Sequence, residues 1–439
     1  SYNVTVWPTP AASIPATYPA DLINGQEIEM KAQVSGGDPS TWTYAWTVDG
    51  NATANTQGIT YKAVNTAADG SKTVAVGLKA VNTPADIDMP YTYRGEHLIT
   101  VWATPSLKSR VEEALSLCNG QSSTLSVTMQ GGYAAGWVYE WTRNGERLDN
   151  SGNRLDVTGS NGLDVTITDT YTVKATNTIN GEIVFEETYN FTVTVWPTPK
   201  VAMDQQTYPD NVLSGDAVEM SFSYLGGDPE AWSSAWYLNG VDLGNSTTSY
   251  TFNAENNNTA AGIESTVRLV VDNRPAGALE FSHHFAFEHV YKVWAQPVVV
   301  SQEASVINTC DGRQVVVGIE VAGGQADGWS FSWELNGSAL GEATQARHAF
   351  TADNKQGSVR TDVYHLTAVN KVDGEVRFEQ SFIFTVNVYP APVADAGTTD
   401  FNNYYGESVA LGLTVDGGNP DGWSYSWDNG STTPRIDYL

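Results

Sequence analysis

The chain has 439 residues and is strongly acidic, with 50 Asp and Glu against 22 Lys and Arg and a formal net charge of −28. This charge excludes a basic surface that could neutralise nucleic-acid phosphates, and it disfavours binding to anionic membranes. Hydrophobic residues make up 41% of the chain, which is enough to build buried cores. No stretch of 18 uncharged apolar residues occurs, so the sequence predicts no direct membrane insertion.

A short motif recurs along the whole chain: Val, an aromatic residue, and proline within three residues of that aromatic. Successive copies are 95, 94, 98 and 95 residues apart and begin at Val6, Val101, Val195, Val293 and Val388. A fixed period of this length indicates an array of similar domains. We expect the last strand of a preceding domain in residues 1–10, four complete domains in residues 11–105, 106–199, 200–297 and 298–392, and the first half of a fifth domain in residues 393–439. Both termini then fall inside domains, so we expect the sequence to be part of a longer chain.

Within the first period the sequence predicts short strands separated by tight turns. Asn24-Gly25 favours a turn, apolar residues alternate with polar ones from Glu27 to Val34, and Trp42–Trp46 alternates again before the turn signal Asp49-Gly50. No window shows a sustained helical period. Each period has room for about seven strands. The predicted fold class is therefore all-β, a tandem array of immunoglobulin-like antiparallel β-sandwich domains.

All 14 tryptophans occupy recurring positions in the period, ten of them as pairs four residues apart and four in the aromatic–proline motif. In a strand, residues i and i+4 point to the same face, so both rings of a pair face one side. The later tryptophan lies where an immunoglobulin-like domain packs a tryptophan between its two sheets. We predict that these later tryptophans form the cores: Trp46, Trp141, Trp236, Trp333 and Trp427.

The segments that connect the domains contain proline and lack a Gly/Ser linker, which favours short, semi-rigid joints. The loop before each tryptophan pair contains Gly-Gly and is expected to face the preceding domain. We therefore predict that each motif aromatic packs at a joint near the first tryptophan of the next pair. The predicted partners are Trp7 with Trp42, Trp102 with Trp137, Trp196 with Trp232, Trp294 with Trp329, and Tyr389 with Trp423.

A longer repeat is superimposed on the domain repeat. The second and fourth domains each carry a cysteine, Cys118 and Cys310, at equivalent positions. They also share the segments Asn180–Glu186 and Asp373–Glu379, which have the pattern Asx-Gly-Glu-x-x-Phe-Glu. The repeating unit is therefore expected to be a pair of domains of about 190 residues. Because the two cysteines lie in different domains, we expect no disulfide between them.

The Gly-Gly loop with its tryptophan strand, the Val-Trp-Pro-x-Pro segment and the closing Trp427–Thr433 run resemble the Ig-like or PKD-like tandem repeats of very large bacterial surface proteins. Gliding-motility proteins and surface adhesins of Bacteroidota are the nearest group. The Trp-Asp-Phe-Gly-Asp-Gly run of PKD domains is absent, so the resemblance is a broad one. It covers nearly the whole chain and implies an extracellular, cell-surface location, with other domains of the same longer chain as partners.

No nucleophile elbow, phosphate loop or His-Glu-x-x-His motif is present, so we expect no enzyme activity and no cofactor. The predicted function is a structural stalk or filament shaft of an extracellular bacterial adhesin. The alternative is a cell-surface protein that binds glycans, or a host or substrate surface, through variable loops. Under that alternative, Tyr91, Tyr93, Tyr404 and Tyr405 are better candidates for stacking on sugars than the recurring tryptophans.

Calcium at the joints is a second alternative, because hard cations take oxygen ligands and would relieve repulsion in an acidic array. The candidate ligands are Asp86, Asp88, Asp395 and Asp400. No EF-hand spacing surrounds them. We therefore expect these carboxylates to be solvated.

Overall fold

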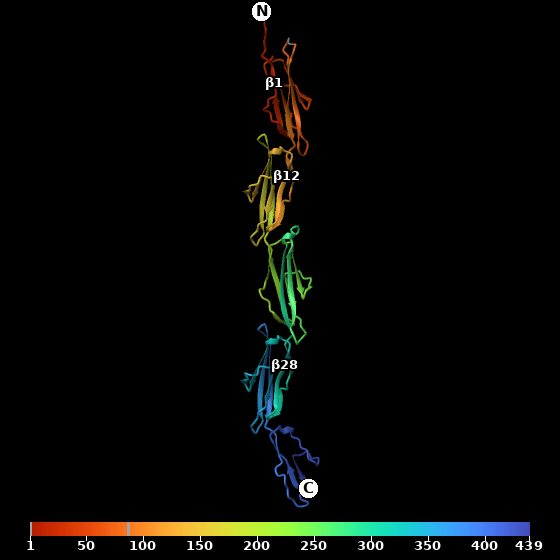
Figure 1. The fold of residues 1–439 in the computed structure, drawn as a ribbon, viewed down its shortest axis with the longest axis vertical. Coiled ribbons are helices and arrows are strands. Elements are labelled where there is room, and N and C mark those ends of the chain that lie inside the picture. Colours follow the sequence, from red (N-terminus) through yellow and green to blue (C-terminus); the bar gives the residue numbers. More distant parts are fainter. Residues whose placement is uncertain (1, 86–87) are drawn as a thin grey trace. The chain divides into compact units, whose positions relative to one another are not determined.

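The computed structural model describes residues 2–85 and 88–439 (Figure 1). Strands dominate this part of the chain, and its helical elements are four 3-10 turns of three residues each, η1 (Ala134–Gly136), η2 (Leu279–Phe281), η3 (Ala326–Gly328) and η4 (Pro420–Gly422). None of these has the length or apolarity needed to cross a membrane. By contacts the chain divides into two compact units. The first comprises Ser1–Lys200, Leu225–Trp232 and Asn273–His283, and the second comprises Val201–Tyr224, Ser233–Asp272 and His284–Leu439.

The first unit begins with a sandwich of two layers, here called sandwich 1. Its five-stranded sheet has the order β2 (Asp21–Ile23), β9 (Tyr91–Trp102), β8 (Ser71–Asn82), β5 (Trp42–Val48), β6 (Asn51–Ala54). The other layer pairs β1 (Ala11–Ser13) with β4 (Gln33–Ser35) and β3 (Glu27–Lys31) with β7 (Gly58–Lys62). Strand β2 runs parallel to β9, and all other pairs are antiparallel.

Sandwich 2, also in the first unit, repeats this arrangement. Its five-stranded sheet has the order β11 (Ala114–Cys118), β17 (Glu182–Trp196), β16 (Ile167–Ile179), β13 (Trp137–Arg143), β14 (Glu146–Arg147). Its three-stranded sheet has the order β10 (Ser106–Arg110), β12 (Ser122–Gln130), β15 (Arg154–Thr158). The first two strands of sandwich 2, β10 and β11, thus lie in different sheets. Strand β11 runs parallel to the last strand, β17. This strand order defines an immunoglobulin-like sandwich.

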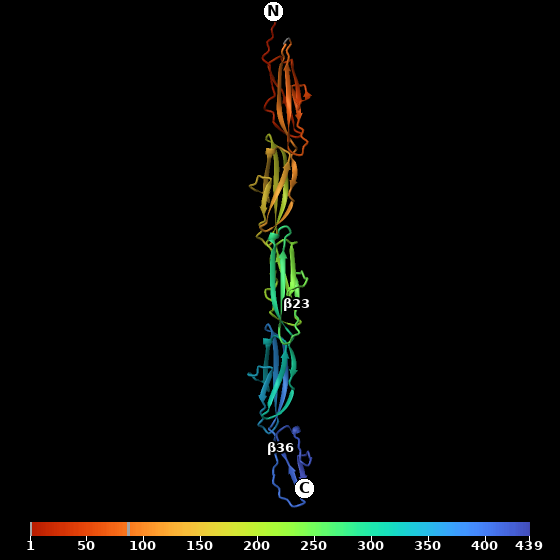
Figure 2. The same ribbon diagram turned by 45° about the vertical axis from the view of Figure 1, so that its right-hand side comes forward.

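Sandwiches 3 and 4 have the same two sheets, and Figure 2 shows them from a second side. In sandwich 3 the orders are β19 (Asn211–Leu213), β25 (His283–Trp294), β24 (Ile263–Asn273), β21 (Trp232–Leu238), β22 (Val241–Asp242), and β18 (Lys200–Met203), β20 (Ala217–Leu225), β23 (Ser249–Asn253). In sandwich 4 they are β27 (Val306–Cys310), β33 (Glu375–Tyr389), β32 (Arg360–Val372), β29 (Trp329–Leu335), β30 (Ser338–Ala339), and β26 (Val298–Gln302), β28 (Gln314–Ala322), β31 (Arg347–Thr351). The fold class is therefore all-β, with tandem immunoglobulin-like sandwiches.

The two ends of the sequence carry less regular structure. After sandwich 4, β34 (Val393–Asp395) pairs with β36 (Thr414–Asp416), and β35 (Val409–Gly412) pairs with β37 (Arg435–Tyr438). Residues 2–10, expected as the last strand of a preceding domain, form no strand. A lone strand has no neighbour to take its backbone hydrogen bonds. The domain boundaries stay a prediction.

The core of each of the first four sandwiches is built around one tryptophan. The side chains of Trp46, Trp141 and Trp236 are fully buried, and that of Trp333 is 2% exposed. Each indole N–H is satisfied by a backbone carbonyl, for example Trp141 by Gly152 at 2.8 Å. Burying a ring of this size stabilises a sandwich by about 3 kcal/mol. The alternation of buried and exposed residues along these strands follows the period of two in the sequence.

Candidate functional site

The joints between successive sandwiches contain the recurring feature of this molecule, a Gly-Gly loop bound to the linker. In all five copies the second glycine donates its N–H to the carbonyl of the residue after the motif aromatic, at 2.8 Å. The pairs are Gly37 to Pro8, Gly132 to Ala103, Gly227 to Pro197, Gly324 to Ala295, and Gly418 to Pro390. This bond fixes the start of each sandwich to its own Gly-Gly loop. We call it the linker clasp.

The geometry of the clasp requires glycine at both positions of the loop. Gly131 and Gly132 have φ of +64° and +69°, a left-handed conformation that side chains disfavour. A Cβ on Gly131 would lie 2.2 Å from the backbone oxygen of Thr104, and one on Gly323 would lie 2.2 Å from that of Gln296. Any other residue would push the linker away from the loop.

A fully buried asparagine at or near the end of the penultimate long strand of each of these four sandwiches also forms hydrogen bonds with the Gly-Gly loop. Its Oδ1 accepts the N–H of the residue after Gly-Gly, and its Nδ2 donates to the carbonyl of that same residue. The four asparagines have 0% exposure and bind as follows: Asn82 to Asp38, Asn177 to Tyr133, Asn273 to Asp228, and Asn370 to Gln325. Losing this side chain would leave a buried donor and acceptor without partners, which costs about 1–3 kcal/mol for each group.

The first tryptophan of each pair holds the same loop from within its own sandwich. Its Nε1–H donates to the carbonyl of the first glycine at 3.0–3.4 Å, as for Trp42, Trp137, Trp232, Trp329 and Trp423. The ring of Trp137 contacts Phe185 edge-on, with ring centres 5.5 Å apart. The structure places these five residues directly after the loop, each bound to it through the indole N–H, and their packing at the joints stays a prediction.

Four motif aromatics end the last strands of their sandwiches, namely Trp102, Trp196, Trp294 and Tyr389, whereas Trp7 lies outside any strand. The ring of Trp102 contacts that of Tyr133 edge-on at 5.5 Å, and its Nε1–H donates to Asp21 Oδ1 at 2.8 Å. Trp102 and its predicted partner Trp137 thus attach to one loop, Trp102 through Tyr133 and Trp137 through Gly131. Trp294 is 9% exposed, donates to Asn211 Oδ1 at 2.9 Å and lies under the Lys292 ammonium group.

The remaining motif aromatics make fewer ring contacts. Trp7 is 40% exposed, Trp196 is paired with Cys118 in the β11–β17 register, and the carbonyl of Tyr389 accepts the N–H of Asp311. The ring pairings predicted for these three residues stay a prediction.

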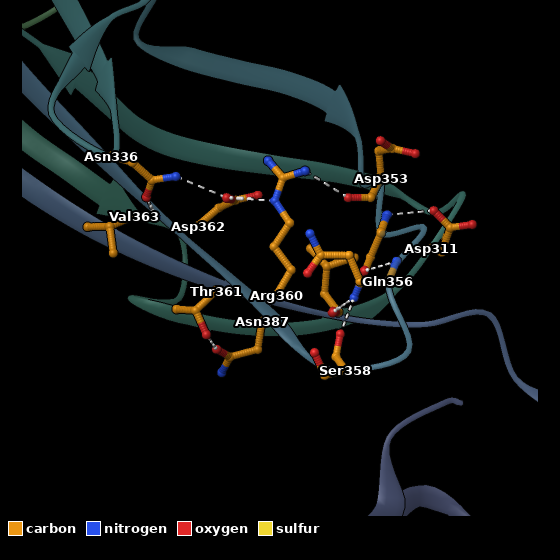
Figure 3. A network of polar contacts seen from close by, with 12 residues as sticks. Asp311, Asn336, Asp353, Gln356, Ser358, Arg360, Thr361, Asp362, Val363 and Asn387 are labelled. Carbon is orange, nitrogen blue, oxygen red and sulfur yellow. Dashed lines mark hydrogen bonds and ion pairs between the residues drawn. The ribbon is translucent and has the colours of Figure 1, made fainter. Parts of the chain in front are cut away.

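A second buried asparagine in each of the first four sandwiches binds the end of the last strand of its own sandwich. Asn65, Asn161, Asn256 and Asn354 each donate Nδ2–H to the carbonyl of the motif valine at 2.6–2.9 Å. The Oδ1 of Asn354 also accepts from Gln356 N–H, and its Nδ2 donates to Ser358 O. Figure 3 shows the polar network around Gln356, Ser358 and Asp311. The salt bridge from Lys355 and the N–H of Asn354 hold the pKa of Asp311 below its ordinary value. The end of each last strand is therefore fixed to its own sandwich.

Sandwiches 1 and 2 also contact each other beside the linker. Asp69 Oδ1 of sandwich 1 accepts the N–H of Gly131 at 2.9 Å, and Asn180 Nδ2 of sandwich 2 donates to Asp21 O at 2.8 Å. The N–H groups of Gly131 and Gly70 hold the pKa of Asp69 below its ordinary value. The hairpin turn at Asn180, between β16 and β17, thus reaches back to sandwich 1.

Sandwiches 3 and 4 contact each other at the equivalent place with different side chains. Asp373 accepts the backbone N–H of Asn211 at 2.9 Å and its Nδ2–H at 2.7 Å. Arg377 binds Asp216 through both terminal nitrogens, at 2.5 and 3.1 Å. Leu213, Trp294 and Val372 form a buried cluster at this joint.

Burial alone would raise the pKa of Asp216. The hydrogen bonds from Arg377 and from the N–H of Leu213 outweigh burial and leave the pKa of Asp216 below its ordinary value. Asp216 is therefore ionised at neutral pH, and its ion pair with Arg377 is formed.

The candidate calcium ligands do not come together in the described residues. Within residues 2–85 and 88–439 no group of three or more His, Cys, Asp or Glu side chains is placed to hold a metal ion. Asp86 lies outside the described residues. Asp395 Oδ1 accepts the N–H of Gly397 at 2.8 Å, and both Asp88 and Asp400 are exposed.

The tyrosines considered for sugar binding fall into two groups. The hydroxyls of Tyr91 and Tyr93 accept the N–H groups of Ala12 and Ile14, so they fix the first strand of sandwich 1. Tyr404 and Tyr405 are 83% and 108% exposed. Nearby, Trp427, which the sequence predicts in a core, is half-buried and lines a cleft of about 570 Å³ with Phe401.

Both cysteines are free. Burial, with Asp228 and Glu280 nearby, raises the pKa of the Cys118 thiol. A raised pKa keeps the thiol protonated, which makes it a poor nucleophile. Cys118 therefore belongs to the packing of sandwich 2.

Sequence reasoning missed the two sets of buried asparagines. A signal for both was present, because Asn82, Asn177, Asn273 and Asn370 recur at 95–97 residues and the set beginning with Asn65 recurs at 95–98. A polar residue that recurs with the domain period, in segments otherwise rich in apolar residues, points to a buried polar clamp.

No protein-family model matches the chain, and no curated protein matches it. Among solved structures it is similar to Sidekick-1 immunoglobulin domains 1–5 (13% identity, 93% of this chain and 85% of that one, TM-score 0.35). It is also similar to the titin I-band fragment I67–I69 (14%, 65% and 97%, 0.39) and to the ICAM-5 D1–D4 ectodomain fragment (12%, 87% and 100%, 0.41). Similarity at these scores carries no argument, and the immunoglobulin-like assignment rests on the strand order.

Proposed function

We propose that this chain is a structural segment of an extracellular bacterial surface adhesin, a stalk or filament shaft without catalytic activity. The observation that supports the proposal is that consecutive linker residues are hydrogen-bonded to different sandwiches. The carbonyl of Trp102 accepts the N–H of Asn24 in sandwich 1, and the next carbonyl, that of Ala103, accepts the N–H of Gly132 in sandwich 2. No linker residue therefore lies between the one bonded to sandwich 1 and the one bonded to sandwich 2.

The same arrangement recurs later in the chain. Trp294 O accepts from Ser214 N at 2.7 Å, and Ala295 O accepts from Gly324 N at 2.8 Å. Tyr389 O and Pro390 O bind Asp311 N and Gly418 N in the same way. Bending such a joint must break backbone hydrogen bonds, whereas a flexible linker would bend by free rotation. Resistance to bending is the property that a stalk needs.

The acidic composition is consistent with this role, because a net charge of −28 makes neighbouring chains repel each other and limits lateral association. The proposed partners are other domains of the same longer chain. Binding of glycans, or of a host or substrate surface, through variable loops is the alternative function. Among the residues suggested for it, the exposed Tyr404 and Tyr405 favour it, whereas Tyr91 and Tyr93 are occupied by backbone contacts.

A pair of glycine variants tests the proposal in the full 439-residue chain. Gly131→Ala with Gly323→Ala places a methyl group against the linker carbonyls. The control, Gly145→Ala with Gly337→Ala, changes two turn glycines of similar positive φ, where an added Cβ would have no atom within 4 Å. Both variants carry a similar left-handed backbone cost, so the contact with the linker is the main difference between them.

Small-angle X-ray scattering should show a narrow distribution of long interatomic distances for the wild type and the control. The joint variant should show a broader and shorter distribution. Identical profiles for all three would overturn the proposal that the clasp sets stiffness. Saturable binding of the wild-type chain to a glycan array would support the alternative function.

A further inference from the structure

The joint between sandwiches 3 and 4 combines the linker clasp with a set of charged contacts. The contacts come from two places that are far apart in sequence: β19 and the turn after it in sandwich 3, and the β32–β33 turn with the start of β33 in sandwich 4. Arg377 and Asp216 form a two-point ion pair, and their side chains are only 32% and 21% exposed. Partial burial weakens screening by solvent, and two-point geometry adds strength and direction to the pair.

The neighbours of this ion pair reinforce it. Asp216 Oδ2 also accepts the N–H of Leu213 at 2.8 Å, which fixes the carboxylate in place. Asp373 binds both the backbone and the side chain of Asn211. Glu375 lies near enough to Arg377 to favour its charged form. The hairpin of sandwich 4 is therefore attached to sandwich 3 through two carboxylates, one on each side of the joint.

The equivalent positions between sandwiches 1 and 2 lack this ion pair. Asp216 corresponds to Gln26, whose Oε1 accepts the N–H of Ile23 at 2.7 Å, and Arg377 corresponds to Val184. Beside the linker, Asn180 donates to a backbone carbonyl, Gly131 donates to Asp69, and the ring of Trp102 contacts that of Tyr133. These two joints thus share the same kind of backbone clasp but differ in the side chains beside it.

We propose that the joint between sandwiches 3 and 4 is an electrostatic latch, closed at low ionic strength and loosened by salt, while the joint between sandwiches 1 and 2 does not respond in this way. This inference rests on the proposed stalk function and deepens it, because it assigns the ionic regulation of stiffness to one joint. The latch consists of Asp216 with Arg377 and Asn211 with Asp373.

Amide hydrogen exchange in the full chain reports the latch directly, because the N–H of Asn211 is bonded to Asp373 across the joint. Peptides that cover residues 211–216 should exchange about five times faster at 1 M NaCl, where the screening length is about 3 Å, than at 0.01 M, where it is about 30 Å. Peptides that cover residues 21–26 should change less than about twofold. Equal responses at the two joints would overturn the proposal.

Variants separate the latch from general effects of salt. Arg377→Val introduces the residue found at the equivalent place in sandwich 2, and it should abolish the salt response of residues 211–216. Asp216→Asn keeps an acceptor for Leu213 N–H and should do the same, and the double variant should add nothing further. Arg94→Val, which removes an exposed arginine from a strand of sandwich 1, is the control for net charge and should leave the response intact. If Arg377→Val also leaves it intact, the latch is wrong.

Scattering on the same samples distinguishes failure of the latch from failure of the stalk. A salt-dependent exchange rate at Asn211 with broad, short distance distributions at every ionic strength would support the latch and contradict the stalk. Narrow, long distributions with no salt response at Asn211 would support the stalk and contradict the latch.

Discussion

The joints between sandwiches 1 and 2 and between sandwiches 3 and 4 share one backbone design and differ in their side chains. In both, a Gly-Gly loop binds the linker carbonyl at 2.8 Å and a buried asparagine holds the loop. Beside the linker the direction of the hydrogen bond is reversed. Asn180 of sandwich 2 donates to sandwich 1, whereas Asp373 of sandwich 4 accepts from sandwich 3. The comparison separates the backbone clasp, which both joints share, from the side-chain bonds, which differ between them.

Replacing the buried asparagines should have the largest effect and should be equal at both joints. Asn177→Ala and Asn370→Ala each remove two hydrogen bonds from a site with no solvent, so each sandwich should lose about 3 kcal/mol of stability. Calorimetry of the full chain, with exchange to locate the affected sandwich, measures this loss. Asn190→Ala, at an exposed position on β17, is the control and should cost under about 0.5 kcal/mol. Unequal losses at the two joints would mean that the clasp is not a common element.

Removing the indole N–H from the loop should have a smaller effect, again shared by both joints. Trp137→Phe and Trp329→Phe keep a large ring but leave the carbonyl of the first glycine without its donor, which should cost about 1 kcal/mol. Exchange of the N–H groups of Gly132 and Gly324 should rise by about fivefold, since this factor corresponds to about 1 kcal/mol. No change at these amides would show that the tryptophans contribute packing alone.

Acid should weaken the joint between sandwiches 3 and 4 through Asp216. The pKa of Asp216 is lower when folded, so its contribution to stability is complete above the unfolded value of about 3.9 and is lost as the pH falls through the folded pKa. Carbon-13 NMR of the aspartate carboxyls, assigned with Asp216→Asn, follows this titration. Arg377→Val should move the pKa of Asp216 upward. A titration unchanged by this substitution would contradict the ion pair as its cause.

Transferring the ion pair to the first joint should have the smallest effect. Gln26→Asp with Val184→Arg places the latch residues between sandwiches 1 and 2, and should add about 0.5 kcal/mol that disappears at high salt. Exchange of residues 21–26 at low and high ionic strength detects the gain. Val184→Arg alone is the control, because it supplies the charge without its partner. A gain of equal size from the single variant would show that the pairing itself contributes nothing.

The period of the sequence is enough to predict the sandwich fold and the burial of four of the five rings expected in cores, Trp46, Trp141, Trp236 and Trp333. Trp46 and Trp141 lie four residues after another tryptophan in an alternating strand, and such a strand has only one face that can be buried. The contacts of Trp102 are beyond this reasoning. They depend on the path of the Gly-Gly loop, which brings Tyr133 to the ring and leaves Trp137 with Phe185. The alternation of residues in a strand does not predict the burial of Asn177, because a single amide in a strand is ordinarily solvated. Only its recurrence with the domain period indicates that it is buried.

The placement of consecutive carbonyls on different sandwiches limits where the chain tolerates extra residues. The period varies from 94 to 98 residues, yet in all five copies the residue directly after the motif aromatic carries the clasp. Loops elsewhere absorb the differences in length. One residue inserted between Trp102 and Ala103 would add a peptide unit bonded to neither neighbour, with its own pair of free backbone torsions. A single inserted residue at that position would thus convert a fixed joint into one that rotates freely about its backbone torsions.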